Sequence, residues 1–147
     1  MKRPFHALIP IAALRGTSEA VAESTSLTLD QLPFETVYKV AEHGILARDA
    51  DGNPLVVLLK LDKGDFLPPH GEQGGTRLLT VMSGEHSWGD GNDVNQEAEH
   101  LYGPGTFLVL PAKGGDHWAA GRSGDVLLQI VFVRNGTLMP EAAAQLK

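Results

Sequence analysis

Short runs of apolar residues, separated by turn-forming residues, dominate the chain from about residue 36 onward. The segment 36–40 alternates in polarity, which predicts a strand with one exposed face. Segment 55–61 is almost continuously apolar, as expected of a strand covered on both faces. Further strands are predicted over 76–83, 106–111 and 125–133. Many short strands with frequent turns indicate a sandwich or a barrel.

The turns between these strands are marked by glycine and acidic residues. Asp51-Gly52 lies in the turn cluster 49–54, and a second turn is predicted over 62–65. The polar segment 89–100 lacks strand periodicity and is predicted to be an exposed loop. The tail 140–147 is rich in helix formers and predicts a short helix.

Residues 1–30 carry little strand signal, and two interpretations of them stay open. Lys2 and Arg3 precede the apolar stretch 5–14, and the small residues 20–22 resemble a cleavage site, as in a secretory signal. That interpretation places the protein in the periplasm or outside the cell. Otherwise the segment is an N-terminal arm of a cytoplasmic protein. The stretch is too short to be a transmembrane segment.

Composition narrows the class of protein. The 147 residues fit one domain, over 31–147, and 42% apolar with 20% charged residues is ordinary for a globular chain. The 17 glycines and 9 prolines favour strands and turns over long helices. A net charge of −6 argues against a nucleic-acid partner, because phosphate binding needs a cationic face. The absence of cysteine excludes disulfides and thiolate metal sites.

Two spaced sets of residues stand out from this background. The first has the form Gly-x5-His-x-Glu-x4-Arg-x6-Gly, and the second has the form Gly-x5-Pro-x2-Gly-x2-His. Their members are Gly64, His70, Glu72, Arg77 and Gly84, then Gly105, Pro111, Gly114 and His117.

These sets resemble the two motifs of the cupin superfamily, Gly-x5-His-x-His-x3-4-Glu-x6-Gly and Gly-x5-Pro-x-Gly-x2-His-x3-Asn. The stretches PPH, LTVMSG, YGPGTFLVLPA and HWA are also similar to small bacterial cupins. The resemblance covers about residues 55–133. It implies an all-β fold, a cupin-type β-barrel (double-stranded β-helix or jelly roll), here with an N-terminal arm and a C-terminal helix. It also implies a homodimer.

The sequence departs from the family pattern at the positions of the metal ligands. Glu72 stands where the pattern has its second histidine, and Arg77 stands where it has its glutamate. One extra residue in the second motif moves His117 one place later, and Asp116 takes the expected place. The resemblance therefore implies metal binding for His70 and His117, and for Glu72 only by chemical analogy.

Strand geometry alone also brings these residues together. Residues two apart on a strand face the same side, so His70 and Glu72 are expected to point into the barrel. Arg77 lies on a later strand, and His117 follows a more distant one. Imidazole nitrogens and a carboxylate oxygen in an apolar barrel are good ligands for a divalent metal.

Two interpretations of the pocket stay open. In the first, His70, Glu72 and His117 hold a divalent metal (Fe, Mn, Zn, Ni or Cu), and Arg77 pairs with Glu72 or holds an anionic substrate. In the second, no metal binds, because Arg77 occupies its space and would repel it. Glu72 and Arg77 then form an internal ion pair, and Arg77 binds a carboxylate or another polar ligand. Gln73 is a substitute ligand or hydrogen-bond donor in either case.

His86 and Trp88 share a strand face and are candidates for lining the pocket mouth and binding ligand. The alternative for this pair is a surface histidine beside a half-buried aromatic. His6 and His43 have no context that distinguishes them from surface or loop histidines.

Three functions follow from these observations. The protein is an enzyme, such as a metal-dependent oxygenase or isomerase with Glu72 and Arg77 as catalytic groups, a module that binds a small molecule, or a structural cupin. The fold does not choose among the three.

Overall fold

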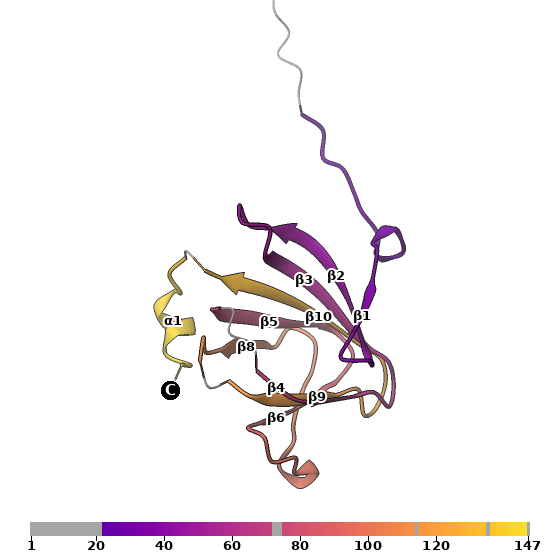
Figure 1. Ribbon diagram of the computed structural model, residues 1–147, viewed down its shortest axis with the longest axis vertical. Helices are drawn as coiled ribbons and strands as arrows, with labels where there is room; N and C mark the ends of the chain where they lie inside the picture. Colours follow the sequence, from indigo (N-terminus) through magenta and orange to yellow (C-terminus); the bar gives the residue numbers. More distant parts are fainter. Residues whose placement is uncertain (1–21, 72–74, 114, 135, 147) are drawn as a thin grey trace, which may run out of the picture.

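The computed structural model describes residues 22–71, 75–113, 115–134 and 136–146, which form an almost entirely β-stranded structure (Figure 1). The strands are β1 Glu35–Val37, β2 Ala41–Arg48, β3 Pro54–Leu61, β4 Phe66–His70, β5 Thr76–Ser83, β6 His86–Asp90, β7 His100–Tyr102, β8 Phe107–Leu110, β9 His117–Ala120 and β10 Val126–Val133. The helices are the 3-10 turns η1 Leu29–Gln31 and η2 Gln96–Ala98 and the short α-helix α1 Pro140–Ala143.

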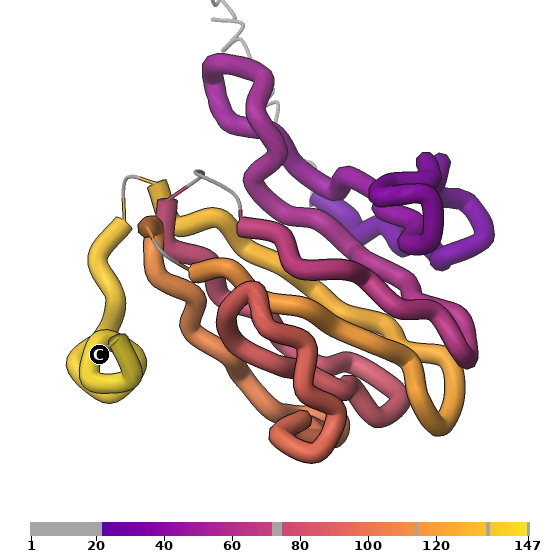
Figure 2. The backbone as a smooth tube through the Cα atoms, turned by 60° about the horizontal axis from the view of Figure 1, so that its bottom comes forward, coloured from indigo at the N-terminus to yellow at the C-terminus, as the bar shows by residue number. Residues whose placement is uncertain are grey.

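The strands form two antiparallel sheets that face each other (Figures 1 and 2). The larger sheet has the order β1-β2-β3-β10-β5-β8, and the smaller one has the order β4-β9-β6-β7. β10 lies between β3 and β5, far from both in sequence, so its apolar run is enclosed by strands on either side. This is the all-β architecture that the two motifs implied.

Four of the predicted strands are confirmed. β3, β5, β8 and β10 lie within one residue of 55–61, 76–83, 106–111 and 125–133. The turn at Asp51-Gly52 joins β2 to β3, with Gly52 at a φ of 84°. The predicted C-terminal helix is present as α1. The segment 91–99 between β6 and β7 is mostly exposed, as predicted for a polar loop, and it contains the exposed turn η2. The ends of the predicted loop 89–100 belong to the strands, with Gly89 and Asp90 in β6 and His100 in β7.

The prediction of a strand over 36–40 is wrong beyond Val37. Tyr38 and Lys39 both adopt the left-handed region, with φ of 51° and 67°, and the Val40 amide donates to the Val37 carbonyl. Two successive positive φ values are the signature of the tight hairpin turn that suits the twist of antiparallel strands. Such a conformation is strained for a tyrosine, so the alternating sequence gives no sign of it.

Strand β3 is covered on both faces, as its continuous apolar run predicts. Val57 and Leu59 face the interior, while Leu58 on the other face is 4% exposed. Leu58 pairs with Gly44 of β2, and the ring of Phe34 lies 3.1 Å from where a Cβ of Gly44 would be. The lack of a side chain at Gly44 thus lets Phe34 pack on the outer face of the larger sheet.

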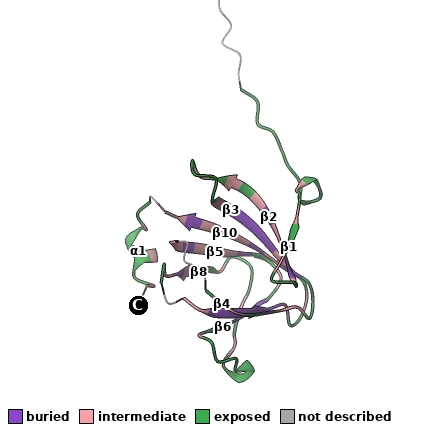
Figure 3. Ribbon diagram, viewed as in Figure 1, coloured by how far each residue is buried: buried purple, intermediate pink, exposed green. Residues whose placement is uncertain are grey.

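The core lies between the two sheets, where the buried residues gather (Figure 3). The larger sheet contributes Leu61, Val81 and Leu128, and the smaller sheet contributes Leu67 and Trp88. Residues on the connecting loops and on α1 are largely exposed. Among the described residues, no helix is long and apolar enough to cross a membrane.

Gly89 is a position where the fold requires glycine. A Cβ at this position would lie 2.1 Å from two ring atoms of Trp118, its pairing partner on β9. Trp118 is 1% exposed and cannot move away without leaving its packed position. We therefore expect Gly89→Ala to lower the free energy of unfolding by about 2 kcal/mol, through overpacking.

Urea denaturation of the two proteins measures this change. Gly103→Ala is the matched control, because no atom lies within 4 Å of its Cβ position and its φ is not positive. The control is expected to change the free energy of unfolding by less than about 0.5 kcal/mol. Equal stabilities for the two variants would contradict the packing of Trp118 across Gly89.

Candidate functional site

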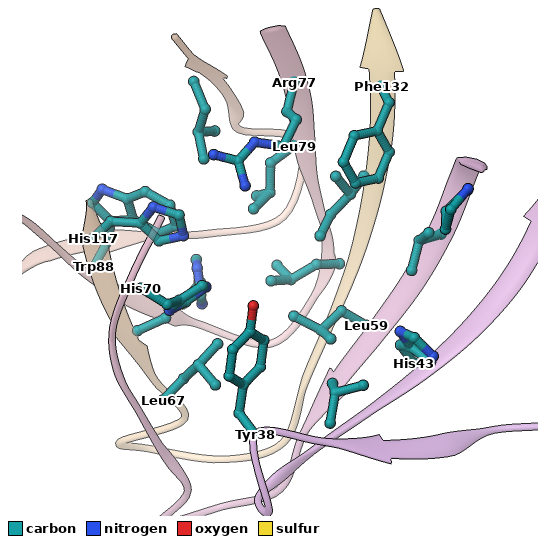
Figure 4. A pocket seen from close by; sticks show the side chains of 18 residues that line it. Tyr38, His43, Leu59, Leu67, His70, Arg77, Leu79, Trp88, His117 and Phe132 are labelled. Carbon is teal, nitrogen blue, oxygen red and sulfur yellow. The ribbon is translucent and has the colours of Figure 1, made fainter. Parts of the chain in front are cut away.

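A cavity of about 400 Å³ lies between the two sheets (Figure 4). Apolar side chains of β3, β5 and β10 form most of its wall, and seven residues with a nitrogen or oxygen atom in the side chain interrupt it. These are Tyr38, His43, His70, Arg77, His86, Trp88 and His117. A mostly apolar cavity with a few polar groups is typical of a small-molecule site.

A β-bulge in β4 turns His70 toward this cavity. Leu67 pairs with Ala119 and His70 pairs with His117, so β4 spans three residues where β9 spans two. Leu67 and His70 both line the cavity, although residues three apart on a regular strand face opposite sides. The bulge contains Pro68 and Pro69, which cannot donate to the ladder and are tolerated at such irregularities.

Both histidines of the pair are held by the backbone in the same tautomer. The Nδ1 atom of His70 lies 2.8 Å from the Pro68 carbonyl oxygen, and Nδ1 of His117 lies 2.7 Å from that of Gly115. A carbonyl only accepts, so each Nδ1 carries the proton and donates it. In the neutral form of each ring, the lone pair is then on Nε2. The two rings lie 4.3 Å apart between centroids, at 61°.

His117 is the more rigidly packed of the two. Its ring stacks on Trp88, with centroids 4.1 Å apart and planes at 13°, and the Trp88 indole donates to Asp90. Burial lowers the pKa of His117 to about 4, and the neighbouring His70 and Arg77 act in the same direction. His117 is therefore neutral at neutral pH, as a metal ligand must be.

Asp116, which takes the family's ligand position, does not line the cavity. Its side chain accepts a hydrogen bond from Asn92, and its carbonyl accepts one from the Gly91 amide. Asp116 thus fastens the start of β9 to the loop after β6. The extra residue in the second motif consequently leaves His117, one place later, on the cavity side.

His86 is a deeply buried histidine rather than a surface one. It is 0% exposed, and neither ring nitrogen has a hydrogen-bond partner within the part of the chain that the structure describes. Burial, followed by the charge of His117, lowers its pKa to about 4. Trp88 is also buried. The alternative interpretation, a surface histidine beside a half-buried aromatic residue, is therefore wrong.

Arg77 brings a positive charge into the cavity. It lies on β5 between Phe132 of β10 and Leu110 of β8, and it is 5% exposed. Its guanidinium points into the cavity, on the same side as His117 (Figure 4). A guanidinium in apolar surroundings interacts strongly with any anion that reaches it, because little water screens the charge.

Two further polar residues reach the cavity that the sequence did not indicate. Tyr38 points its hydroxyl inward from the β1–β2 turn, and its ring lies 4.7 Å from that of His70 (Figure 4). His43 lies on β2, lines the cavity with a side chain only 25% exposed, and is 3.7 Å from Glu35. The prediction that His43 is a surface or loop histidine is wrong.

Glu72 and Gln73 lie outside the described residues, and so does His6. In the sequence, Glu72 and Gln73 both follow β4, which ends at His70, and precede β5, which begins at Thr76. Among the described residues, no three histidine, aspartate or glutamate side chains are grouped closely enough to hold a metal ion. The described part of the site thus offers the imidazoles of His43, His70, His86 and His117, the guanidinium of Arg77 and a largely apolar wall.

No protein-family model and no curated protein sequence matches this chain. Solved structures do. The polyketide cyclase RemF from Streptomyces resistomycificus is 19% identical with a TM-score of 0.57, over 85% of this chain and 100% of that one. KdgF from Halomonas sp. is 17% identical with a TM-score of 0.54, and the match covers 77% of this chain and 97% of KdgF. A cupin superfamily protein from Desulfitobacterium hafniense DCB-2 is 20% identical with a TM-score of 0.52, and the match covers 78% of this chain and 95% of that protein.

The two buried histidines predict a pH-dependent stability. Their pKa of about 4 in the folded protein lies below the ordinary 6.5, so between these values the unfolded chain binds protons that the folded one does not. The stability that these two histidines contribute is therefore fully present above pH 6.5 and is lost as the pH falls toward 4. Each histidine contributes about 1.4 kcal/mol per pH unit in this window.

Urea denaturation between pH 7.5 and about 5, in the presence of EDTA, measures this slope. His86→Phe should lower the pH dependence by about 1.4 kcal/mol per pH unit, whatever it does to stability at neutral pH. His100→Gln, at an exposed residue of strand β7, is the control and should keep the wild-type slope. An unchanged slope in His86→Phe would show that His86 is not a neutral buried group.

Proposed function

We propose that this protein, which has the cupin fold, binds a divalent metal ion through His70 and His117 and a small organic molecule in the same cavity. The histidine pair carries the proposal. The Nδ1–H of each ring donates a hydrogen bond to a backbone carbonyl. Nε2 is then the atom of each ring that would coordinate a metal ion. Ligand histidines in metalloproteins are oriented by the same kind of second hydrogen bond.

The donor set suits a transition metal rather than a hard cation. Two imidazoles bind Fe, Mn, Zn, Ni or Cu, and Glu72 is the proposed third ligand from the segment that follows His70. A metal with open positions would supply Lewis-acid polarisation of a carbonyl or activation of O₂. The chain's own contribution is to orient the imidazoles, to exclude water with its apolar wall, and to bind the organic molecule.

Catalysis is part of this proposal because one structure of the same fold is a polyketide cyclase. We propose an oxygenase or isomerase activity, with Glu72 and Arg77 as catalytic groups. Arg77 faces the space in which the organic molecule would lie.

A second candidate is a metal-free binding module. The position of Arg77 favours it, because a guanidinium in the same apolar cavity opposes a dication. In that case Glu72 and Arg77 form the internal ion pair, and the histidines serve as hydrogen-bonding groups for the ligand.

Elemental analysis of tag-free protein separates the two candidates. We expect close to one equivalent of Fe, Mn, Zn, Ni or Cu, after reconstitution where necessary, and a loss of most of it in His70→Ala. His100→Ala is the control, because His100 lies on exposed strand β7, and it should retain the metal. Clean absence of metal after reconstitution would leave the metal-free candidate.

Arg77→Gln provides a quantitative test of the same choice. The charge of Arg77 acts on the His117 ring, so its removal takes a repelling charge away from the metal position. We expect the affinity for Zn²⁺ to rise by about tenfold, equivalent to about 1.4 kcal/mol. Competition with a chromophoric chelator measures the affinity. The matched control is Arg122→Gln, because Arg122 pairs with Glu99 and does not line the cavity.

A further inference from the structure

We infer that two copies of this chain associate through the outer face of the larger sheet, over strands β5, β8 and β10. The two motifs implied a homodimer without indicating where the copies would meet. This surface lies on the opposite side of the sheet from the cavity, so the inference depends on neither the metal nor the organic molecule. Its basis is the chemistry of the face, the contrast with the adjoining part of the same sheet, and the extent of the face.

Alternation along the strands decides which side chains form this face. Leu79 of β5, Leu110 of β8 and Ile130 of β10 line the cavity, so the residues next to them in sequence point to the other side of the sheet. The apolar residues at these outward positions form a surface that we call the outer patch: Leu78, Met82, Phe107, Val109, Leu127 and Val131.

The outer patch is continuous across the three strands. Val131 pairs with Leu78, and Leu78 pairs with Val109, so their side chains form one row from β10 to β8. Met82 is 47% exposed and Phe107 is 68% exposed. The solvated face of an antiparallel sheet is ordinarily polar, and broad apolar patches on soluble proteins mark interaction sites.

The adjoining part of the same face, over β2 and β3, is covered by the chain itself. The ring of Phe34 packs against Gly44, beside the buried Leu58. The Lys60 ammonium lies 3.4 Å from the centre of that ring and 3.9 Å from the Glu42 carboxylate. Over the outer patch no described helix plays this part, since α1 lies to one side of the strands (Figures 1 and 2).

The polar groups of the face favour a second copy over a different partner. Arg77 is the only charged residue of β5, β8 and β10, and it lines the cavity on the other side of the sheet. The outward polar residues include Thr80 and Gln129, whose hydroxyl and amide groups both donate and accept and can therefore pair with their own kind in a two-fold interface. Two chains of net charge −6 repel least where they meet through uncharged surface.

The extent of the face suits a dimer of moderate strength. β5 and β10 have eight residues each, a length of about 26 Å, and the strands from β3 to β8 span about 19 Å. Val56 of β3 extends the row of Val131 across this width. The face thus measures about 500 Å² in projection, and the relief of the side chains adds to its accessible area. Specific interfaces bury about 600–1,000 Å² per partner, and this face lies at the lower end of that range.

Sedimentation velocity on the full-length protein, at concentrations from about 1 to about 200 µM, measures the association. We expect a reversible equilibrium between monomer and dimer, with a dissociation constant on the order of 10 µM.

Three substitutions that each add one negative charge assign the interface. Gln129 pairs with Thr80 and Leu58 at the middle of the face, and Gln129→Glu is expected to raise the dissociation constant at least about 100-fold, because like charges would meet in an apolar contact. Phe107→Glu, at the most exposed residue of the outer patch, should act in the same direction and covers the case in which Gln129→Glu does not fold. Leu101→Glu is the matched control, because Leu101 is 57% exposed but lies on β7 of the smaller sheet, and it should leave the dissociation constant unchanged.

Circular dichroism and thermal unfolding report whether each variant is folded. A wild-type protein that stays monomeric at about 200 µM would overturn the inference. So would a dimer that persists in folded Gln129→Glu, or in folded Phe107→Glu if Gln129→Glu is unfolded. Equal weakening by Leu101→Glu would place the contact elsewhere and would also contradict the inference.

Discussion

The irregular pairing of β4 with β9 is the constraint on which the site depends. The extra residue at Pro68–Pro69 changes the side to which β4 points its side chains, and His70 consequently faces the cavity opposite His117. The same bulge supplies the Pro68 carbonyl that fixes the tautomer of His70. One local departure from strand geometry thus sets both the position and the tautomer of the first proposed ligand.

The remaining polar groups are held by the more regular parts of the fold. Arg77 is fixed by its register between β8 and β10, and His86 and Trp88 are fixed two residues apart on β6. Because the ladder determines which side chains face inward, these groups need few interactions of their own to be held in place. The same placement buries these side chains, and burial disfavours a charged imidazole. His86 and His117 therefore stay neutral well below the pH at which an exposed histidine titrates.

Much of the architecture was predictable because strands and turns leave periodic signals. The runs 55–61, 76–83, 106–111 and 125–133 and the two motifs sufficed for the fold. β4, β6 and β9 are shorter, and the prolines of β4 and the glycine of β6 obscure the alternation of those two strands. Tyr38 was missed because a strained turn, not a pattern, brings it to the cavity. His43 was missed because only the pairing of β2 with β1 and β3 shows which way it faces.

The pairing of a proposed metal with Arg77 in one cavity appears unfavourable only when the organic ligand is ignored. An acidic group placed between a dication and a guanidinium is attracted by both, and it screens each charge from the other. Linkage then requires that the metal and the anion raise each other's affinity by the same factor. An arginine at the position where the family pattern has a glutamate would thereby make metal binding depend on the ligand, instead of preventing it. The departure from the motif would then couple the binding of the metal to the binding of the organic ligand in the same cavity.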